Sequence, residues 1–260
     1  MRRRQENSLP LTLKSRTASC RRVRSVEQTD TFSDKSWVTA QCLPTVSAAD
    51  FSGFSATGLQ FNGHTKLNGT RLQLTDTAST NEAASAFWTA PVSVQTFTNT
   101  FTFQLTNPNA DGFTFTIQNS DVTALGSPGA GLGYGKFSTM TASIPKSVAI
   151  KFDLFNNSGE GANSTGIYTN GASPTVPATT LGGGVNLHSG DMFQVQMRYD
   201  GTTLTMTILD LTVPANTFTT SFTVNIPSIV GGTNAFVGFT GGTGGQTATQ
   251  EILNWTYTTP

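Results

Sequence analysis

The stretch MFQVQMRYDGTTLTMTILD, residues 192–210, constrains the fold more than any other part of the chain. Apolar side chains occupy every second position on both sides of Asp200-Gly201, which is typical of two β-strands that each bury one face. The Asp-Gly pair favours a tight turn because both residues tolerate a positive φ. The sequence therefore predicts an antiparallel hairpin at this point.

The same texture extends from Phe51 to the end of the chain, with strand-like runs separated by turn clusters. No segment longer than about two turns shows helical periodicity. About ten strands within roughly 210 residues predict an all-β fold, a large antiparallel sandwich. The further predicted strands lie at 67–76 (a hairpin through Asn68-Gly69), 96–105, 112–119, 148–154, 222–226, 235–239 and 252–257.

The first 47 residues differ from the rest. They show neither period and are rich in Arg, Ser and Thr, so we predict a basic, disordered leader at 1–47 and a sandwich domain at 48–260. Residues 1–50 hold nine Lys/Arg and five Asp/Glu, leaving six (15 − 9) and ten (15 − 5) for the remainder. A nucleic-acid-binding arm is the alternative reading of the leader, but the net charge of zero favours neither nucleic acid nor a membrane surface as partner.

Cysteine usage and hydropathy give little further information. Cys20 and Cys42 both lie in the leader, where they could pair under oxidising conditions, and no Cys/His cluster suggests zinc. No run of 18 apolar residues is present, so we predict no membrane insertion. The chain begins with a basic Met1–Arg4 segment, but the apolar core of a signal peptide does not follow it.

The sequence argues against an enzyme. His64 and His188 lie beside no recognisable nucleophile and have no metal-ligand spacing, so we expect loop or strand-end roles for them. No strand carries the paired acids that a sandwich glycosidase uses. The Gly-rich stretches at 126–135, 181–184 and 241–245 fit no phosphate-binding motif, although the first and last could let a ligand approach the backbone.

A candidate cation site follows the strand at 148–154. Asp153 leaves the face opposite the apolar residues, and Asn157 and Glu160 come shortly after it. Calcium prefers such a mixture of carboxylate and carbonyl oxygens. The alternative is that Asp153 caps a turn and the amides are ordinary surface residues.

Four motifs, in order along residues 51–257, together resemble the legume-type (L-type) lectin family, with a texture closer to bacterial members than to seed lectins. The opening strands and the strand at 84–94 are similar to those of the family. In chain order, the motifs are FSGFSATGLQFNGHTKLNGTRLQLTD (51–76), FTFQLTNPNADGFTFTIQN (101–119) with its Ala-Asp-Gly, VAIKFDLFNN (148–157), and VGFTGGTGGQTATQEILNWTY (237–257).

The resemblance implies a concanavalin A-like β-sandwich (jelly roll) of two large sheets and a smaller third, with a shallow sugar site at one end. In the family an Asp after an often-cis Ala-Asp peptide accepts sugar hydroxyls. A glycine N–H donates, an aromatic ring lies under the sugar, and an Asn amide both binds sugar and ligates calcium. A late loop, here 240–246, closes the site. These roles map to Asp111, to Gly129 or Gly131, to Phe155, to Asn157, and to Gly242 and Thr243 in the late loop.

The family also binds a pair of metal ions, and here the sequence departs from it. The calcium ligands map to Asp153, the Phe155 carbonyl, Asn157 and Glu160. The transition metal additionally uses a Glu and a His, whose positions hold Lys151 and Ser164. We therefore expect calcium and no transition metal, and we predict that the Lys151 ammonium pairs with Asp153, Glu160 or both.

The resemblance thus implies a non-enzymatic, extracellular or cell-surface lectin that binds glycans or polysaccharide, weakly per site and usefully when multivalent. One alternative is a structural or adhesive module that self-assembles and keeps only a vestigial sugar site. A glycosidase of similar architecture is the other, and it would require two acids facing each other across a groove.

Overall fold

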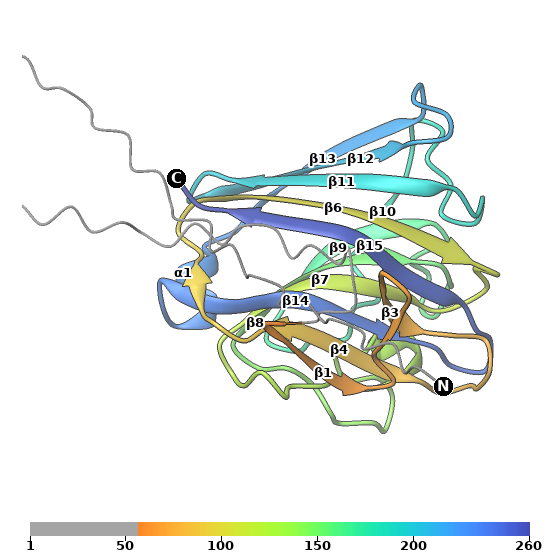
Figure 1. The fold of residues 1–260 in the computed structure, drawn as a ribbon, viewed down its shortest axis with the longest axis horizontal. Helices are drawn as coiled ribbons and strands as arrows, with labels where there is room; N and C mark the ends of the chain where they lie inside the picture. The colour runs from red at the N-terminus through yellow and green to blue at the C-terminus, as the bar shows by residue number, and fades with distance from the viewer. Residues whose placement is uncertain (1–56) are drawn as a thin grey trace, which may run out of the picture. The chain divides into compact units, whose positions relative to one another are not determined.

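The computed structural model describes residues 57–260, so the predicted leader and both cysteines lie outside the described residues. Residues 57–260 form two antiparallel β-sheets and two short helices (Figure 1). This arrangement confirms the predicted all-β sandwich. Between residues 57 and 260 there is no helix with the length and apolar character that crossing a membrane requires.

One sheet has eight strands and carries the candidate site at one end. The strands of residues 57–260 fall into two sheets, and the smaller third sheet that the resemblance implies is not among them. In spatial order the strands are β1 (Leu59–Gly63), β4 (Ala83–Trp88), β14 (Asn234–Gly242), β7 (Gly112–Gln118), β8 (Ser147–Asp153), β9 (Ser164–Thr169) and β10 (Thr179–Thr180), with β5 (Val92–Ser93) beside β14.

The other sheet has seven strands and includes both predicted hairpins. Asp200-Gly201 lies in the turn between β11 and β12. Asn68 ends β2 and Gly69 begins the turn to β3, so both predicted hairpins are present. In spatial order the strands are β13 (Thr217–Thr223), β12 (Thr203–Asp210), β11 (Met192–Tyr199), β6 (Phe97–Thr106), β15 (Thr249–Thr258), β3 (Arg71–Thr75) and β2 (Lys66–Asn68).

The core between the sheets consists largely of the predicted alternating residues. Val148, Ile150, Phe152 and Leu154 are all buried in it. Aromatic rings from both sheets meet there, and Phe152 stacks on Phe113 with 4.6 Å between ring centroids. Burial of this apolar surface is the main force that holds the two sheets together.

The outer faces of the sheets differ. Strands β11 and β12 alternate between buried and more exposed residues, whereas every residue of β7 and β8 is buried. A second apolar cluster covers the outside of the eight-stranded sheet. Its buried members are Phe87, Tyr134, Ile144, Ala149 and Tyr168. Tyr134 and Ile144 come from the connection between β7 and β8, so this connection packs over the sheet.

One predicted strand is partly wrong. The sequence predicts a strand at 222–226, but β13 ends at Thr223 and a short helix, α1, spans Ile226–Val230. Pro227 cannot donate a ladder hydrogen bond, and the Asn225 side chain caps the helix by accepting from the Ser228 N–H at 3.0 Å. The other short helix, η1, spans Gly129–Gly131 and lies at the candidate site.

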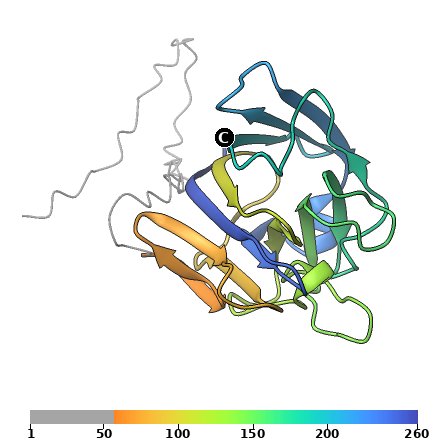
Figure 2. The ribbon, with the colours of Figure 1, turned by 90° about the vertical axis from the view of Figure 1, so that its right-hand side faces the viewer.

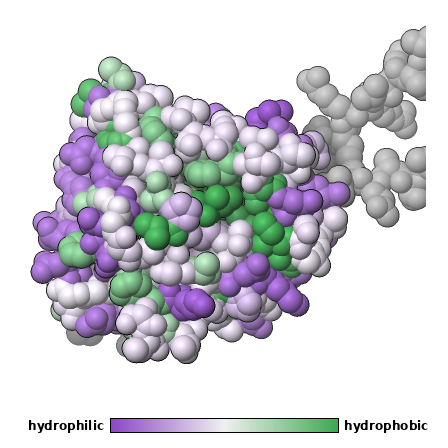
Figure 3. Space-filling view, turned by 180° about the vertical axis from the view of Figure 1, so that it is seen from behind, coloured by the Kyte–Doolittle hydropathy of each residue, from purple (hydrophilic) through white to green (hydrophobic). Residues whose placement is uncertain are grey.

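The loops that matter for function gather at one end of the sandwich. Figure 2 looks onto this end, where η1 appears as a short lime-green helix. The face seen from behind is a mosaic of polar and apolar residues (Figure 3). Over the described residues, the exposed large apolar side chains are Met140, Phe155, Val176, Met192, Leu211 and Val213.

Candidate functional site

Asp111 lies at the centre of the site, immediately before β7. Its peptide bond to Ala110 is cis, as the resemblance implies. Its backbone N–H donates to the Gly242 carbonyl at 3.2 Å, and its carbonyl accepts from the Leu154 N–H at 2.8 Å. Two neighbouring strand ends therefore fix the backbone of this residue on both sides.

The Asp111 carboxylate is buried, with 3% of the residue exposed. Its Oδ1 accepts a hydrogen bond from Asn157 Nδ2 at 3.2 Å, whereas Oδ2 has no hydrogen-bond partner of normal geometry within residues 57–260. Burial raises the pKa of this carboxyl above its ordinary value. The Asn157 amide and a weaker interaction with the Gly244 N–H oppose the rise, while the charge of Glu160 adds to it. Asp111 therefore offers a buried acceptor oxygen that no hydrogen bond of normal geometry satisfies.

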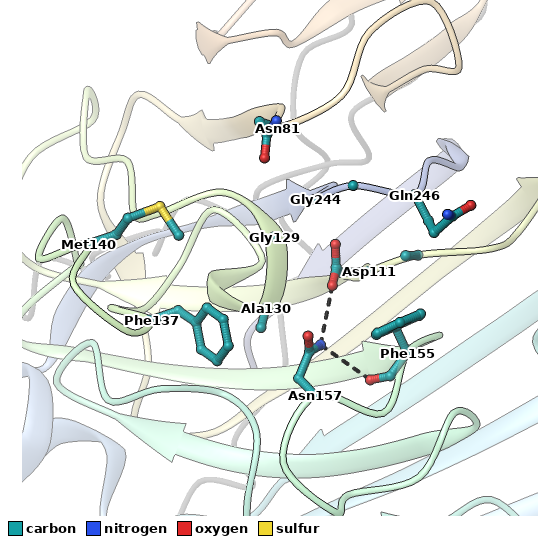
Figure 4. A pocket seen from close by; sticks show the side chains of 12 residues that line it. Asn81, Asp111, Gly129, Ala130, Phe137, Met140, Phe155, Asn157, Gly244 and Gln246 are labelled. Atoms are coloured by element: carbon teal, nitrogen blue, oxygen red, sulfur yellow. Dashed lines mark hydrogen bonds between the residues drawn. The ribbon is translucent and has the colours of Figure 1, made fainter.

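A pocket of about 440 Å³ opens above this carboxylate (Figure 4). Asn157 lies between Asp111 and Phe155 and also donates to the Phe155 carbonyl at 3.3 Å. The Phe155 ring is 40% exposed beside them. The lining residues are Asn81, Ala110, Asp111, Gly129, Ala130, Phe137, Met140, Phe155, Asn157, Gly244, Gly245 and Gln246.

The structure brings four of the predicted sugar-site residues together around the pocket, namely Asp111, Gly129, Phe155 and Asn157. It places Gly131, Gly242 and Thr243 below the lining rather than in it. Gly242 accepts from Asp111 N, and the Thr243 carbonyl accepts from the Gly129 N–H at 2.9 Å. These residues support the site through their backbones.

The expected glycine donor is already engaged in the described residues. The Gly129 N–H is taken by Thr243, and the Gly131 N–H donates to the Pro128 carbonyl at 3.1 Å. A ligand hydroxyl would have to compete with these carbonyls. Gly129 still matters for access, because its φ of 59° suits glycine and a Cβ there would lie 4.0 Å from Asp111 Oδ2.

Sequence reasoning missed the opposite wall of the pocket. Phe137 and Met140 form an isolated β-bridge with each other, and both line the pocket. The exposed Asn81 also reaches it from the loop before β4. An aromatic residue and a methionine within the turn-rich FSTM segment were the available signal, but no periodicity identifies them as site residues.

The residues expected to hold calcium offer a suitable set of oxygens. Asp153 Oδ2 is taken by other side chains, whereas Oδ1 has only a long 3.4 Å contact from the Phe155 N–H. Glu160 is 6% exposed, and its Oε1 lacks a partner within residues 57–260. With the Phe155 carbonyl and the Asn157 amide, these are oxygen types that a hard cation prefers. Asn157 turns its NH2 group, not its oxygen, towards the Phe155 carbonyl.

Only two of these four expected ligands, Asp153 and Glu160, are charged side chains. No group of three or more His, Cys, Asp or Glu gathers within residues 57–260. Burial raises the pKa of Asp153 to about 6, although Lys151 opposes the rise. A divalent cation beside Asp153 would favour its charged form.

The residues at the transition-metal positions do not fit such an ion. Lys151 Nζ donates to Asp153 Oδ2 at 2.8 Å, which confirms the predicted pairing with Asp153. Ser164 Oγ donates to the same oxygen at 3.2 Å. An ammonium has no lone pair to offer a metal, and it occupies the oxygen that a metal would need.

Both histidines lie in loop or strand-end positions. His64 follows β1 and has its Nδ1 3.4 Å from Glu82, and His188 contacts the Ala162 carbonyl through Nε2 at 2.6 Å. Asp111 is the one carboxylate among the lining residues, all of which lie within residues 57–260. The pocket lining therefore lacks the facing pair of acids that a glycosidase would need.

Two solved lectin structures share this architecture. The lectin from Bauhinia forficata in complex with GalNAc superposes with a TM-score of 0.68 and 25% identity, covering 83% of this chain and 98% of that chain. Lectin I-B4 from Griffonia simplicifolia, solved in a metal-free form, gives a TM-score of 0.67 and 25% identity, with coverages of 81% and 98%. The fold is therefore that of a legume lectin.

Sequence comparison identifies the family. Favin from Vicia faba is 32% identical over 177 residues, which are 63% of this chain and 70% of favin. A family model described as the legume lectin domain matches residues 48–260. The chain belongs to the legume lectin domain family and contains a carbohydrate-binding, lectin-like domain without enzymatic activity.

Proposed function

We propose that the pocket around Asp111 binds one sugar unit of a glycan, outside the cell, above a single calcium ion. The observation that carries this proposal is the buried Asp111 Oδ2, which has no partner of normal geometry within the described residues and lies at a pocket. A buried acceptor without a partner costs about 1–3 kcal/mol, and a ligand hydroxyl would remove this cost. The complex of the Bauhinia forficata lectin with GalNAc supports a sugar as the ligand class.

The remaining lining residues suit a hexose. The exposed Phe155 ring offers an apolar face to the C–H side of a sugar ring. Asn81 and Gln246, both exposed, offer amide groups at the rim. Few partly exposed polar contacts predict weak binding per site, so biological use would depend on several sites acting together.

Calcium would be held by Asp153 Oδ1, the Phe155 carbonyl, the Asn157 amide oxygen and Glu160. Support comes from the Glu160 Oε1 atom without a partner within the described residues and from the long contact at Asp153 Oδ1. The ion would orient Asn157 and Phe155, two residues of the proposed sugar site, from below. Its chemistry here is positioning, since the family is non-enzymatic.

Titration calorimetry with GalNAc, galactose, glucose and mannose in calcium tests the sugar site. Removing a charged acceptor costs about 1.5–3 kcal/mol, so we expect Asp111→Asn to weaken binding by about tenfold or more. Asp191→Asn, a matched change just before β11, should bind as the wild type does. Failure of the wild type to bind any of these sugars, followed by failure on a glycan array, would refute the proposal.

Calcium dependence is tested separately. We expect Glu160→Gln to weaken calcium binding by about tenfold or more, because it removes a charged ligand, and to lower sugar affinity only when calcium is limiting. Calcium affinity is measured by calorimetry on chelator-treated protein. Equal calcium affinity of Glu160→Gln and wild type would show that Glu160 is not a ligand.

A further inference from the structure

Lys151 is a fully buried charged residue below the sugar pocket. Its relative exposure is 0%, and it points to the outer side of β8. Burying an ammonium is costly unless partners replace its water shell. Such a residue in a strand calls for an explanation in terms of what it contacts.

The ammonium makes two hydrogen bonds and one contact with an aromatic ring. It donates to Asp153 Oδ2 and to the Thr175 carbonyl, both at 2.8 Å, and it lies 5.5 Å from the centre of the Tyr168 ring. The Tyr168 hydroxyl donates to the same Thr175 carbonyl at 2.8 Å. Lys151 therefore ties β8 to β9 and to the loop that contains Thr175.

Asp153 transmits this support to the sugar pocket. Lys151 and Ser164 saturate its Oδ2, which leaves Oδ1 facing the Phe155 N–H. The next residue, Leu154, donates its N–H to the Asp111 carbonyl. The fixed cation thus holds in place the strand end that anchors Asp111.

The charges around Lys151 leave room for one external cation and not for two. The single ammonium is bonded to Asp153, while Glu160 Oε1 has no partner within the described residues. The Asp153 oxygen that would face a second ion is therefore occupied, whereas Glu160 Oε1 and Asp153 Oδ1, with only its long contact, remain for calcium.

We propose that Lys151 is an internal cation that replaces the transition metal of the family and positions the Asp153 carboxylate, so that the site needs at most one external ion. The part that concerns sugar affinity rests on the function proposed above, whereas the part that concerns metal stoichiometry does not. Lys151 acts as a positioning residue, because it contacts Asp153 and lies below the lining of the pocket.

Metal stoichiometry of the wild-type chain is the first test. Calcium-saturated protein is titrated with Mn²⁺, and free Mn²⁺ is followed by electron paramagnetic resonance. We expect no stoichiometric Mn²⁺ binding. One tightly bound Mn²⁺ per calcium-saturated chain would overturn the proposal, whether or not the protein binds sugar. A result of this test is therefore independent of the proposed function.

A designed exchange is the second test. Lys151 and Ser164 both contact Asp153 Oδ2, so Lys151→Glu combined with Ser164→His places three ligand side chains around one point. We expect this double variant to bind one Mn²⁺ or Zn²⁺ per chain. The single variant Lys151→Glu, which lacks the histidine, should bind the same metal at least about tenfold more weakly. The control is Lys151→Met with Ser164→Ala, which offers no new ligand.

Sugar affinity, measured with and without Mn²⁺, distinguishes a positioning role of Lys151 from a contribution to general stability. We expect sugar affinity of the Lys151→Glu, Ser164→His variant to fall on chelation of Mn²⁺ and to recover on its return, while Mn²⁺ leaves the wild type unchanged. Wild-type sugar affinity that rises on adding Mn²⁺ to calcium-saturated protein would contradict the proposal. If the double variant does not fold, the Mn²⁺ titration of the wild type still decides.

Discussion

The outer faces of the two sheets carry similar polar residues in different surroundings. On β12 the outward Thr203, Thr205 and Thr207 are partly exposed, whereas on β7 the outward Thr114 and Thr116 are fully buried. The connection between β7 and β8 accounts for the difference, since it packs over the eight-stranded sheet. A polar outer face is an ordinary solvent surface on one sheet, and on the other it is an internal hydrogen-bond network.

The comparison teaches where substitutions should matter. A buried polar group that loses its partner retains its desolvation cost, whereas an exposed one exchanges its partner for water. Equivalent changes on the two outer faces should therefore differ widely in their effect on the free energy of unfolding. Two matched pairs of changes and one pH titration test this, from the largest expected effect to the smallest.

The largest difference is expected between the two outward cations. Lys151→Met leaves Asp153 buried without its charge partner, which should cost about 3–5 kcal/mol of unfolding free energy. Arg198→Met changes an exposed side chain on β11 and should stay within about 0.5 kcal/mol of the wild type. Urea unfolding at neutral pH and fixed calcium measures both. Equal losses of unfolding free energy in the two variants would mean that burial of the outer face of the eight-stranded sheet does not determine the effect of the substitution.

The second prediction concerns the pH dependence of stability at Tyr134, in the connection that packs over the eight-stranded sheet. Burial raises the pKa of Tyr134 to about 12, from an ordinary value of 10.0. The folded state holds this proton more tightly than the unfolded state, so stability is lost as pH rises from 10 towards 12, by up to about 3 kcal/mol. Thermal unfolding of Tyr134→Phe should show a shallower alkaline decline than that of the wild type. If the stability of the variant and of the wild type declined equally with pH, a group other than Tyr134 would be responsible for the alkaline loss.

The smallest difference is expected between two threonines. Thr114 Oγ1 shares hydrogen bonds with Thr116 at 2.6 Å and Thr240 at 2.8 Å, all buried. Thr114→Val should cost about 1–3 kcal/mol because these partners lose a bond away from water. Thr207→Val affects only an exposed 2.9 Å contact with Thr219 and should stay within about 0.5 kcal/mol. Chemical denaturation measures the loss of unfolding free energy in both variants. A larger loss for Thr207→Val than for Thr114→Val would contradict the comparison.

The sequence predicts the strands well because their information is local. The apolar alternation in residues 192–210 and the Asp-Gly turn appear unchanged as β11 and β12. The end of β13 was misplaced because the capping role of Asn225 depends on where the chain turns, and the apolar Ile226 continues the alternation. Hydrophobic periodicity cannot separate a strand residue from the first residue of a short buried helix.

The candidate site was only partly predictable. Asp111 and Asn157 follow from motifs that resemble a family, and the Lys151–Asp153 contact follows from strand geometry, since the two side chains leave the same face. The wall made by Phe137 and Met140, and the engagement of the Gly129 N–H, depend on how irregular loops fold back. Loops lack a period, so their contacts cannot be read from spacing.

The strand order has a consequence for synthesis of the chain. Strand β14 lies between β4 and β7, and β15 lies between β3 and β6, so each sheet is closed by a strand made long after its neighbours. At about 5–20 residues per second, a nascent chain waits roughly 6–30 seconds with these strand edges unpaired. Gly242 and Gly244, which adjoin Asp111, also arrive only then. Before β14 and β15 emerge, the nascent chain therefore lacks these glycines beside Asp111 and exposes strand edges that can pair with other chains.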